Sequence, residues 1–120
     1  MGLPWVRLDT QFPHNPKVLA LAEDRNWRAI AVYACALSYC GAHGTDGFIP
    51  TGALPFIHAT RREADQLLAV GLWKPAGQGG YEIPDWTDYQ PSNEEAEQRK
   101  NRMRELAHMR WHGSSNAADA

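Results

Sequence analysis

The stretch FIHATRREADQLLAVGLW, residues 56–73, decides the fold of this chain. It carries a polar break at 58–60, then a segment that opens on two arginines and ends at Gly71. Thr60 and Glu63 have the spacing of a capping box, in which the threonine hydroxyl accepts a hydrogen bond from the glutamate amide and the glutamate side chain accepts one from the threonine amide. A helix is therefore predicted to begin at Thr60 and to stop at Gly71.

This helix has two different faces. Spacing of three and four residues groups the apolar side chains on an inner face made of Ala64, Leu67 and Leu68. The outer face is predicted to carry Arg61, Arg62, Asp65, Gln66 and Ala69. Arginine can grip guanine through two hydrogen bonds, and glutamine can do the same with adenine. The alternative is an ordinary solvated face, on which residues four apart such as Arg61 and Asp65 pair with each other.

Further helices are predicted before this one. Residues 27–43 form the most hydrophobic segment and are expected to be the central core helix. Its inner face is predicted from three-and-four spacing, broadened by neighbouring apolar residues: Trp27, Ile30, Ala31, Ala34, Leu37 and Ser38, with Tyr33, Ala36 and Cys40. A shorter helix begins at Pro16. Thr51 can cap another, which Pro55 makes short or irregular because proline removes an intrahelical hydrogen bond.

Short segments between the helices predict strands. Residues 5–8 alternate apolar and polar side chains, and 47–50 form a very short strand. Residues 72–74 and 81–83 flank a glycine-rich turn and predict a hairpin. Three helices followed by a hairpin is the order of a winged helix-turn-helix. The predicted fold class is therefore mainly α with a small β-hairpin, α+β.

The chain is predicted to consist of one domain and a tail. The winged helix-turn-helix domain covers residues 1–91, and Trp86 and Tyr89 in its last segment are expected to pack down onto the domain. A second capping box, at 92–95, opens a charged amphipathic tail helix over 92–112. Residues 113–120 are small and polar and are predicted to be disordered.

Composition limits the possible functions. The chain has 120 residues and a net charge of −2, which argues against a protein that coats nucleic acid by bulk charge. No apolar run approaches the roughly 20 residues that a membrane helix needs. The first residues lack the order of a secretory signal. We expect a cytoplasmic protein with no membrane association.

No enzyme, cofactor or metal site is predicted. Cys35 and Cys40 are five residues apart inside an apolar helix, and the spacing and second ligand pair of a zinc site are missing. The histidines are scattered, and no phosphate loop or nucleophile motif occurs. The cysteines are interpreted as small buried hydrophobic residues in a reducing compartment.

The hairpin and the tail supply the remaining candidate contacts. Lys74 lies at the base of the hairpin, and Gln78 is a polar residue in a tip that has no cation. The tail has a local excess of positive charge, which predicts phosphate contacts by Arg99, Lys100, Arg102 and Arg104. Its apolar residues predict self-association through Met103, Leu106 and Trp111. The alternatives are an acidic partner, or a partly docked tail whose arginines lie along the surface.

Five segments together resemble a known family: WVRLD (5–9) with FPHNPKV (12–18), TDGFIP (45–50), GLW (71–73) and DWTDYQPS (85–92). The chain resembles small winged-helix proteins of actinobacterial phages and prophages over roughly residues 4 to 105. It is distantly similar to the N-terminal domain of phage replisome organisers and to DnaD-like primosome proteins. The resemblance implies a DNA-binding or replication-associated role, self-association, and residence in the host cytoplasm. We expect no counterpart of the second domain with which replisome organisers recruit the helicase.

Two hypotheses follow from the sequence. In the first, the chain is a non-catalytic, phage-type winged-helix protein that binds double-stranded DNA in replication or regulation, with the contacts at Arg61, Arg62, Gln66, Lys74, Gln78 and the four tail cations. In the second, it is an interaction module that forms a homo-dimer or higher oligomer, or binds a host replication or regulatory protein, without functional DNA contact.

Overall fold

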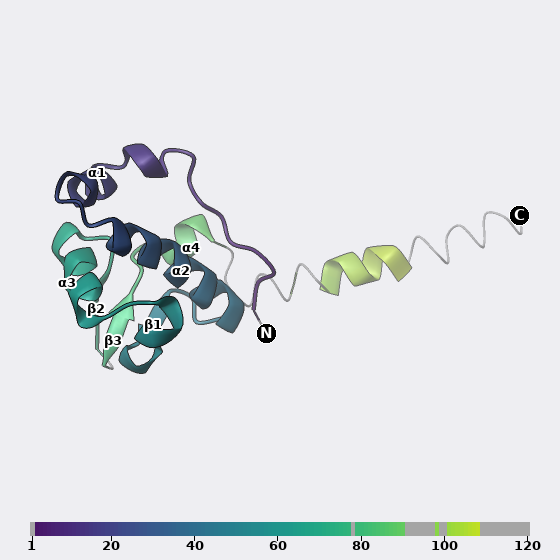
Figure 1. Cartoon of the computed structure of the whole chain (residues 1–120). Helices are drawn as coiled ribbons and strands as arrows, with labels where there is room; N and C mark the ends of the chain where they lie inside the picture. The colour runs from purple at the N-terminus through teal and green to yellow at the C-terminus, as the bar shows by residue number, and fades with distance from the viewer. Residues whose placement is uncertain (1, 78, 91–97, 99–100, 109–120) are drawn as a thin grey trace, which may run out of the picture.

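The computed structural model describes residues 2–77, 79–90, 98 and 101–108. The elements follow one another as η1 (Phe12–His14), α1 (Pro16–Glu23), α2 (Trp27–His43), β1 (Phe48–Pro50), η2 (Thr51–Ile57), α3 (Arg61–Val70), β2 (Lys74–Ala76), β3 (Gly80–Glu82) and α4 (Trp86–Tyr89) (Figure 1). The fold is mixed α+β with a small antiparallel sheet, which confirms the predicted α+β class.

The sheet has three strands in the order β1-β3-β2. The predicted hairpin is present as β2 and β3, and the predicted strand at 47–50 is present as β1, which pairs with β3 through Ile49 and Tyr81. Gly80 of β3 pairs with Pro50 of β1, and a Cβ on Gly80 would come within 2.5 Å of the Ile49 carbonyl oxygen. The first hairpin strand begins two residues later than predicted, at Lys74.

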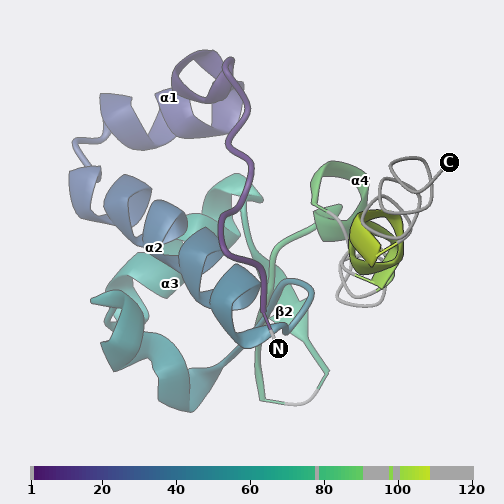
Figure 2. The same cartoon turned by 90° about the vertical axis from the view of Figure 1, so that its right-hand side faces the viewer.

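The core lies between the helices and this sheet. Helix α2 packs against α1 and α3 (Figure 2). The largest fully buried side chains come from all these elements: Trp73, Leu21, Ile49, Ile57, Leu67, Val32 and Cys40. The described residues therefore bury one continuous hydrophobic cluster.

The predicted inner face of α2 is wrong in part: Ala36, Leu37 and Cys40 are buried as predicted, but four other residues assigned to it are exposed. The helix buries Ala29, Val32, Ala36, Leu37 and Cys40, whereas Trp27, Ala31, Ala34 and Ser38 are exposed. Residues 29–42 contain no charged side chain, so spacing alone did not identify the buried side. Contacts with α1, α3 and the sheet decided the helix's rotation.

The strand predicted at 5–8 is also wrong, because this segment has no strand pairing in the structure. A side chain replaces the neighbouring strand: the Arg7 amide donates to Gln90 Oε1 at 2.8 Å, and Gln90 Nε2 donates to the Arg7 carbonyl at 2.7 Å. Nearer the start, the Leu3 amide donates to the Gly41 carbonyl at 2.7 Å. The N-terminal arm, residues 2–11, is therefore held to the domain by isolated hydrogen bonds and by the packing of Leu3 and Val6 against the core.

Two other local predictions had different outcomes. The helix with Pro55 is irregular as predicted: η2 is a 3-10 helix, and His58 ends it in the left-handed region with φ of 62°. Trp86 is buried as expected, whereas Tyr89 is 59% exposed and packs onto the domain only in part. Tyr89 lies at the end of the four-residue helix α4, where its ring faces a groove.

The tail is described only in part. Residue 98 and residues 101–108 are helical, as predicted for this part of 92–112. Figure 1 shows 101–108 apart from the domain and at the opposite end from α3. The capping box at 92–95, the expected disorder at 113–120, and the candidate residues Gln78, Arg99, Lys100 and Trp111 lie outside the described residues. Among the helices that are described, none has the length and hydrophobicity to cross a bilayer.

Candidate nucleic-acid interface

The turn before α3 is fastened to α2 by one arginine. Arg28 donates from Nε and Nη2 to the carbonyl oxygen of His58, at 3.3 and 3.1 Å. The amide of Ala59 donates to the carbonyl of Leu54 at 2.9 Å. These bonds fix the direction in which the chain enters α3.

The predicted capping box is confirmed at the start of α3. The Thr60 amide and hydroxyl both donate to Glu63 Oε1, at 2.7 and 2.8 Å, and the Arg62 amide donates to Thr60 Oγ1 at 3.3 Å. Gly71 ends the helix as predicted, with φ of 83°. Both ends of α3 are therefore set by its own sequence.

Glu63 is the one acid of this turn, and it points inward. Its side chain is buried, with Arg28 Nε 3.7 Å from Oε1. Burial alone would raise its pKa, but the hydrogen bonds from Thr60 and the Arg28 guanidinium outweigh burial and hold the pKa below its usual value. Glu63 therefore stays ionised beneath the surface of the helix.

Arg61 and Arg62 occupy the exposed side of the same turn. Arg61 Nε lies 3.7 Å from Asp65 Oδ1, with the two side chains 83% and 60% exposed. An exposed ion pair at this distance contributes little to stability, on the order of 0.2–1 kcal/mol. Arg61 can therefore readily exchange Asp65 for another anion. Within the described part of the chain, no ion pair involves Arg62.

Gln66 is not on the open face that the sequence predicted for it. Its side chain is half-buried, and Nε2 donates to Asn26 Oδ1 at 3.2 Å. Asn26 immediately precedes α2, so this bond joins the two helices. Contact of Gln66 with a base remains a prediction, and it would require this bond to break.

The hairpin carries less free charge than α3. Lys74 and Glu82 are directly paired across β2 and β3, and Lys74 Nζ lies 3.1 Å from Glu82 Oε1. The base of the hairpin is therefore electrically balanced.

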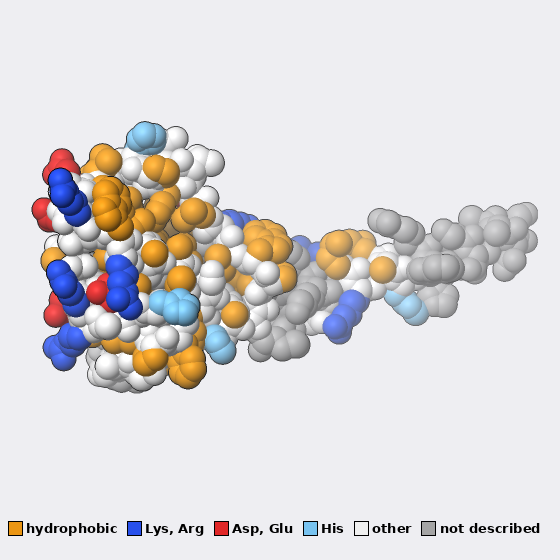
Figure 3. Space-filling model, in the orientation of Figure 1, with side chains coloured by type: hydrophobic (Ala, Val, Ile, Leu, Met, Phe, Trp, Pro, Cys, Tyr) orange, Lys and Arg blue, Asp and Glu red, His pale blue; other side chains and the backbone are white. Residues whose placement is uncertain are grey.

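The sequence reasoning missed Arg28 and its neighbour Arg25. Arg25 lies in the turn between α1 and α2 with φ of 59°, next to the Asn26 that binds Gln66. The sequence shows two arginines around the predicted start of the helix at residue 27, which could have indicated a cationic site. Their position beside α3, however, depends on tertiary contacts. Figure 3 shows cationic side chains, with acids among them, at the end of the molecule that carries α3.

The tail cations are not part of this cluster. Arg102 and Arg104 are exposed, on the helical segment at the opposite end of the molecule from α3 (Figure 1). The structure therefore places Arg28 beside the turn that exposes Arg61 and Arg62, through His58 and Glu63, and leaves the described tail cations apart.

The cysteines and histidines form no metal centre in the described ranges, where no group of three or more potential ligands occurs. Cys35 and Cys40 are free thiols. Burial raises the pKa of Cys40 to about 11, so it stays protonated at neutral pH, and its Sγ lies 3.6 Å from the Phe48 carbonyl oxygen.

No family model matches the chain, and searches of curated proteins and of solved structures found no match.

Proposed function

We propose that this chain is a winged-helix protein that binds duplex DNA through α3 and serves replication or regulation in a phage or prophage. Helices α2, η2 and α3 are followed by the β2–β3 hairpin, and β3 also pairs with the strand between the first two of these helices. That order supports a winged helix-turn-helix, in which the second helix of the motif enters the major groove with its early residues nearest the bases.

One observation carries this proposal. The first turn of α3 exposes Arg61 and Arg62 while its only acid, Glu63, is buried beneath them. Two adjacent guanidinium groups on a rigid, capped helix can grip guanine edges or phosphates. Arg28, 64% exposed beside the same turn, supplies a further positive charge.

The other predicted contacts extend this interface. Lys74 would meet phosphate at the base of the hairpin if Glu82 released it. Arg102 and Arg104 would hold phosphates away from the bases that α3 reads, because the tail segment lies at the other end of the molecule.

Fluorescence anisotropy with mixed-sequence duplexes tests the proposal. The association constant is expected to fall steeply with salt, because each neutralised phosphate releases counterions. Arg61→Ala together with Arg62→Ala is expected to weaken binding at least about tenfold, since each good arginine contact contributes ~1–3 kcal/mol.

A single Arg62→Ala variant is also compared with Arg7→Ala as its matched control. Arg7→Ala removes the same charge from a residue that contacts Tyr89 and Gln90 and not α3, and it is expected to leave binding unchanged. A double α3 variant with unchanged affinity would show that α3 is not the reading helix, whatever Arg7→Ala does.

A protein-interaction module is the second candidate. Met103 and Leu106 are 64% and 49% exposed on the tail helix, and the hairpin base is balanced in charge. Light scattering of the full chain, compared with a chain ending at Pro91, distinguishes the two candidates. A tail-dependent oligomer with no DNA affinity favours the interaction module.

A further inference from the structure

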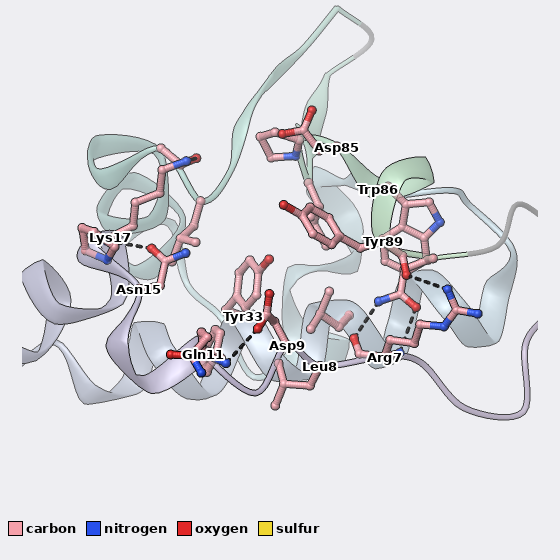
Figure 4. Close-up of a pocket in the computed structure, with 18 of the residues that line it drawn as sticks. Arg7, Leu8, Asp9, Gln11, Asn15, Lys17, Tyr33, Asp85, Trp86 and Tyr89 are labelled. Atoms are coloured by element: carbon pink, nitrogen blue, oxygen red, sulfur yellow. Dashed lines mark hydrogen bonds between the residues drawn. The ribbon is translucent and has the colours of Figure 1, made fainter.

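A groove of about 710 Å³ lies between the N-terminal arm, the middle of α2 and the segment 83–90 (Figure 4). Polar and charged residues line it together with apolar and aromatic ones, among which are Phe12, Tyr33, Leu37, Leu72, Ile83 and Trp86. Leu8 and Tyr89 lie at its edge, and more than half of each side chain is exposed. Its volume is in the range of ~300–1,000 Å³ found for pockets that bury a ligand.

Charged side chains lie on all sides of this groove, with acids along its sides and cations at its ends. Figure 4 shows Asp9 and Asp85 on opposite sides of the hollow, and Lys17 and Arg7 at its two ends. The two cations are turned to backbone oxygens: Arg7 Nη1 donates to the Tyr89 carbonyl at 3.2 Å and Lys17 Nζ to the Gly71 carbonyl at 3.3 Å. Asp9 Oδ1 in turn accepts from the Gln11 amide at 2.7 Å. The groove therefore has apolar residues in its floor, an acid on each side and a cation at each end.

The tail helix has the complementary pattern. At 100° per residue, Met103, Leu106 and Ala107 share one face, with Arg102 on one side of it and Arg104 on the other. All of residues 101–108 are exposed. Apolar anchors at i, i+3 and i+4 are the pattern by which an amphipathic helix binds in a groove.

We infer that the groove of one copy binds the tail helix of a second copy. Met103 and Leu106 enter the apolar floor, and Arg102 and Arg104 face Asp9 and Asp85. The occupant is a second copy because the helix stands apart from its own domain (Figure 1). Each copy supplies one groove and one helix, so two reciprocal contacts close a dimer.

A second hollow lies between α2 and η2, and its lining explains why it is the poorer site for this helix. Cys35, Tyr39 and Phe56 line it together with His43 and His58, and no acid does. A helix flanked by arginines gains no ion pair there. Phe56 is 77% exposed and serves as a control position.

Sedimentation equilibrium of the full chain without DNA tests this inference independently of DNA binding. The wild-type chain is expected to dimerise, and Met103→Glu together with Leu106→Glu to abolish dimerisation, because both anchors become charged. Asn101→Glu, on the opposite face of the same helix, and Phe56→Glu, in the second hollow, are expected to leave the dimer intact.

A charge exchange identifies the two contacting surfaces. The groove variant combines Asp9→Arg with Asp85→Asn, since Asn tolerates the left-handed backbone of Asp85 at φ of 61°. The tail variant combines Arg102→Glu with Arg104→Glu. Each alone is expected to dimerise about tenfold more weakly, and an equimolar mixture to recover the affinity, because each groove then meets a tail of opposite charge. Circular dichroism confirms that both variants fold.

Several results would overturn the inference. A wild-type chain that stays monomeric would do so, whether its tail is free or bound to its own domain. Loss of the dimer in the tail variant but not in the groove variant would show that tails pair with each other. Loss of the dimer in Phe56→Glu would assign the second hollow instead.

Discussion

Two parts of the proposed DNA-binding motif, helix α3 and the β2–β3 hairpin, are stabilised by different kinds of contact. The start of α3 is fixed by contacts within four residues, from Thr60 to Glu63, and by one arginine from α2. The β2–β3 hairpin depends on β1, in which Ile49 pairs with Tyr81 of β3, 32 residues later in the chain. A local device can be recognised in a sequence, whereas the pairing of distant strands must be found in the fold.

Helix α3 and the hairpin also differ in their surface charge. In α3 the acid of the capping box is buried and the exposed Asp65 pairs, among the described residues, only with Arg61, so the first turn keeps an excess of positive charge at its surface. In the hairpin Lys74 and Glu82 are both partly exposed and 3.1 Å apart, so they neutralise each other. This contrast makes α3 the expected reading element and the hairpin a scaffold.

The largest expected effect is on the hairpin. Gly80→Val places a side chain where a Cβ alone comes within 2.5 Å of the Ile49 carbonyl oxygen and 3.0 Å of Pro50 Cα. Because backbone is the obstacle, the strands must separate, and we expect a loss of about 3 kcal/mol in the free energy of unfolding. Urea denaturation measures it. Gly77→Ala, which meets nothing within 4 Å, is the control, and an equal loss there would contradict this account.

The next largest effect is on the start of α3. Glu63→Ala removes the acceptor for both Thr60 donors and leaves Arg28 without its ion pair, so we expect a loss of about 1–2 kcal/mol in the free energy of unfolding. Asp65→Ala on the exposed side of the same helix is the control and should change stability by less than about 0.5 kcal/mol. Thermal or urea unfolding compares the two. Equal effects would mean that the box does not fix the helix.

The pH dependence of stability sharpens the same point. The folded pKa of Glu63 is lowered, so its contribution is present at neutral pH and is lost as pH falls below the usual glutamate range through the folded pKa. The difference in melting temperature between the wild type and Glu63→Gln should therefore shrink steadily on acidification. A difference that stays constant down to the acid limit of folding would argue against an ionised Glu63.

The smallest expected effect concerns the paired charges of the hairpin. Glu82→Gln breaks an exposed ion pair, so stability should change by less than about 1 kcal/mol. The same change frees Lys74, and we expect DNA affinity to rise about twofold to threefold at low salt, as measured by anisotropy. A fall in affinity would mean that Glu82 positions the lysine rather than neutralising it.

The features that could be predicted from the sequence are local ones. The capping box, the glycine stop and the glycine-rich hairpin turn each depend on a few adjacent residues, and α3 begins and ends as predicted. The short strand before Thr51 and the irregular helix around Pro55 were predicted for the same reason.

The features that could not be predicted depend on distant partners. The inner face of α2 was wrong in part because its apolar residues surround the helix. The strand at 5–8 was wrong because its partner is the side chain of Gln90, 83 residues from Arg7. Arg28 was missed because its role requires the His58 carbonyl to lie beside α2. Gln66 was predicted to lie on the exposed face because helical spacing cannot reveal its hydrogen-bond partner Asn26, which precedes α2.

Amide chemical shifts recorded during titration with a short duplex test the central claim most directly. The account predicts that the largest shifts fall on residues 59–66, with smaller ones near Arg28 and at the hairpin, and that they vanish at high salt. Shifts confined to the tail helix and the groove at Tyr89, with residues 59–66 unchanged, would contradict it and would leave an interaction module as the better description.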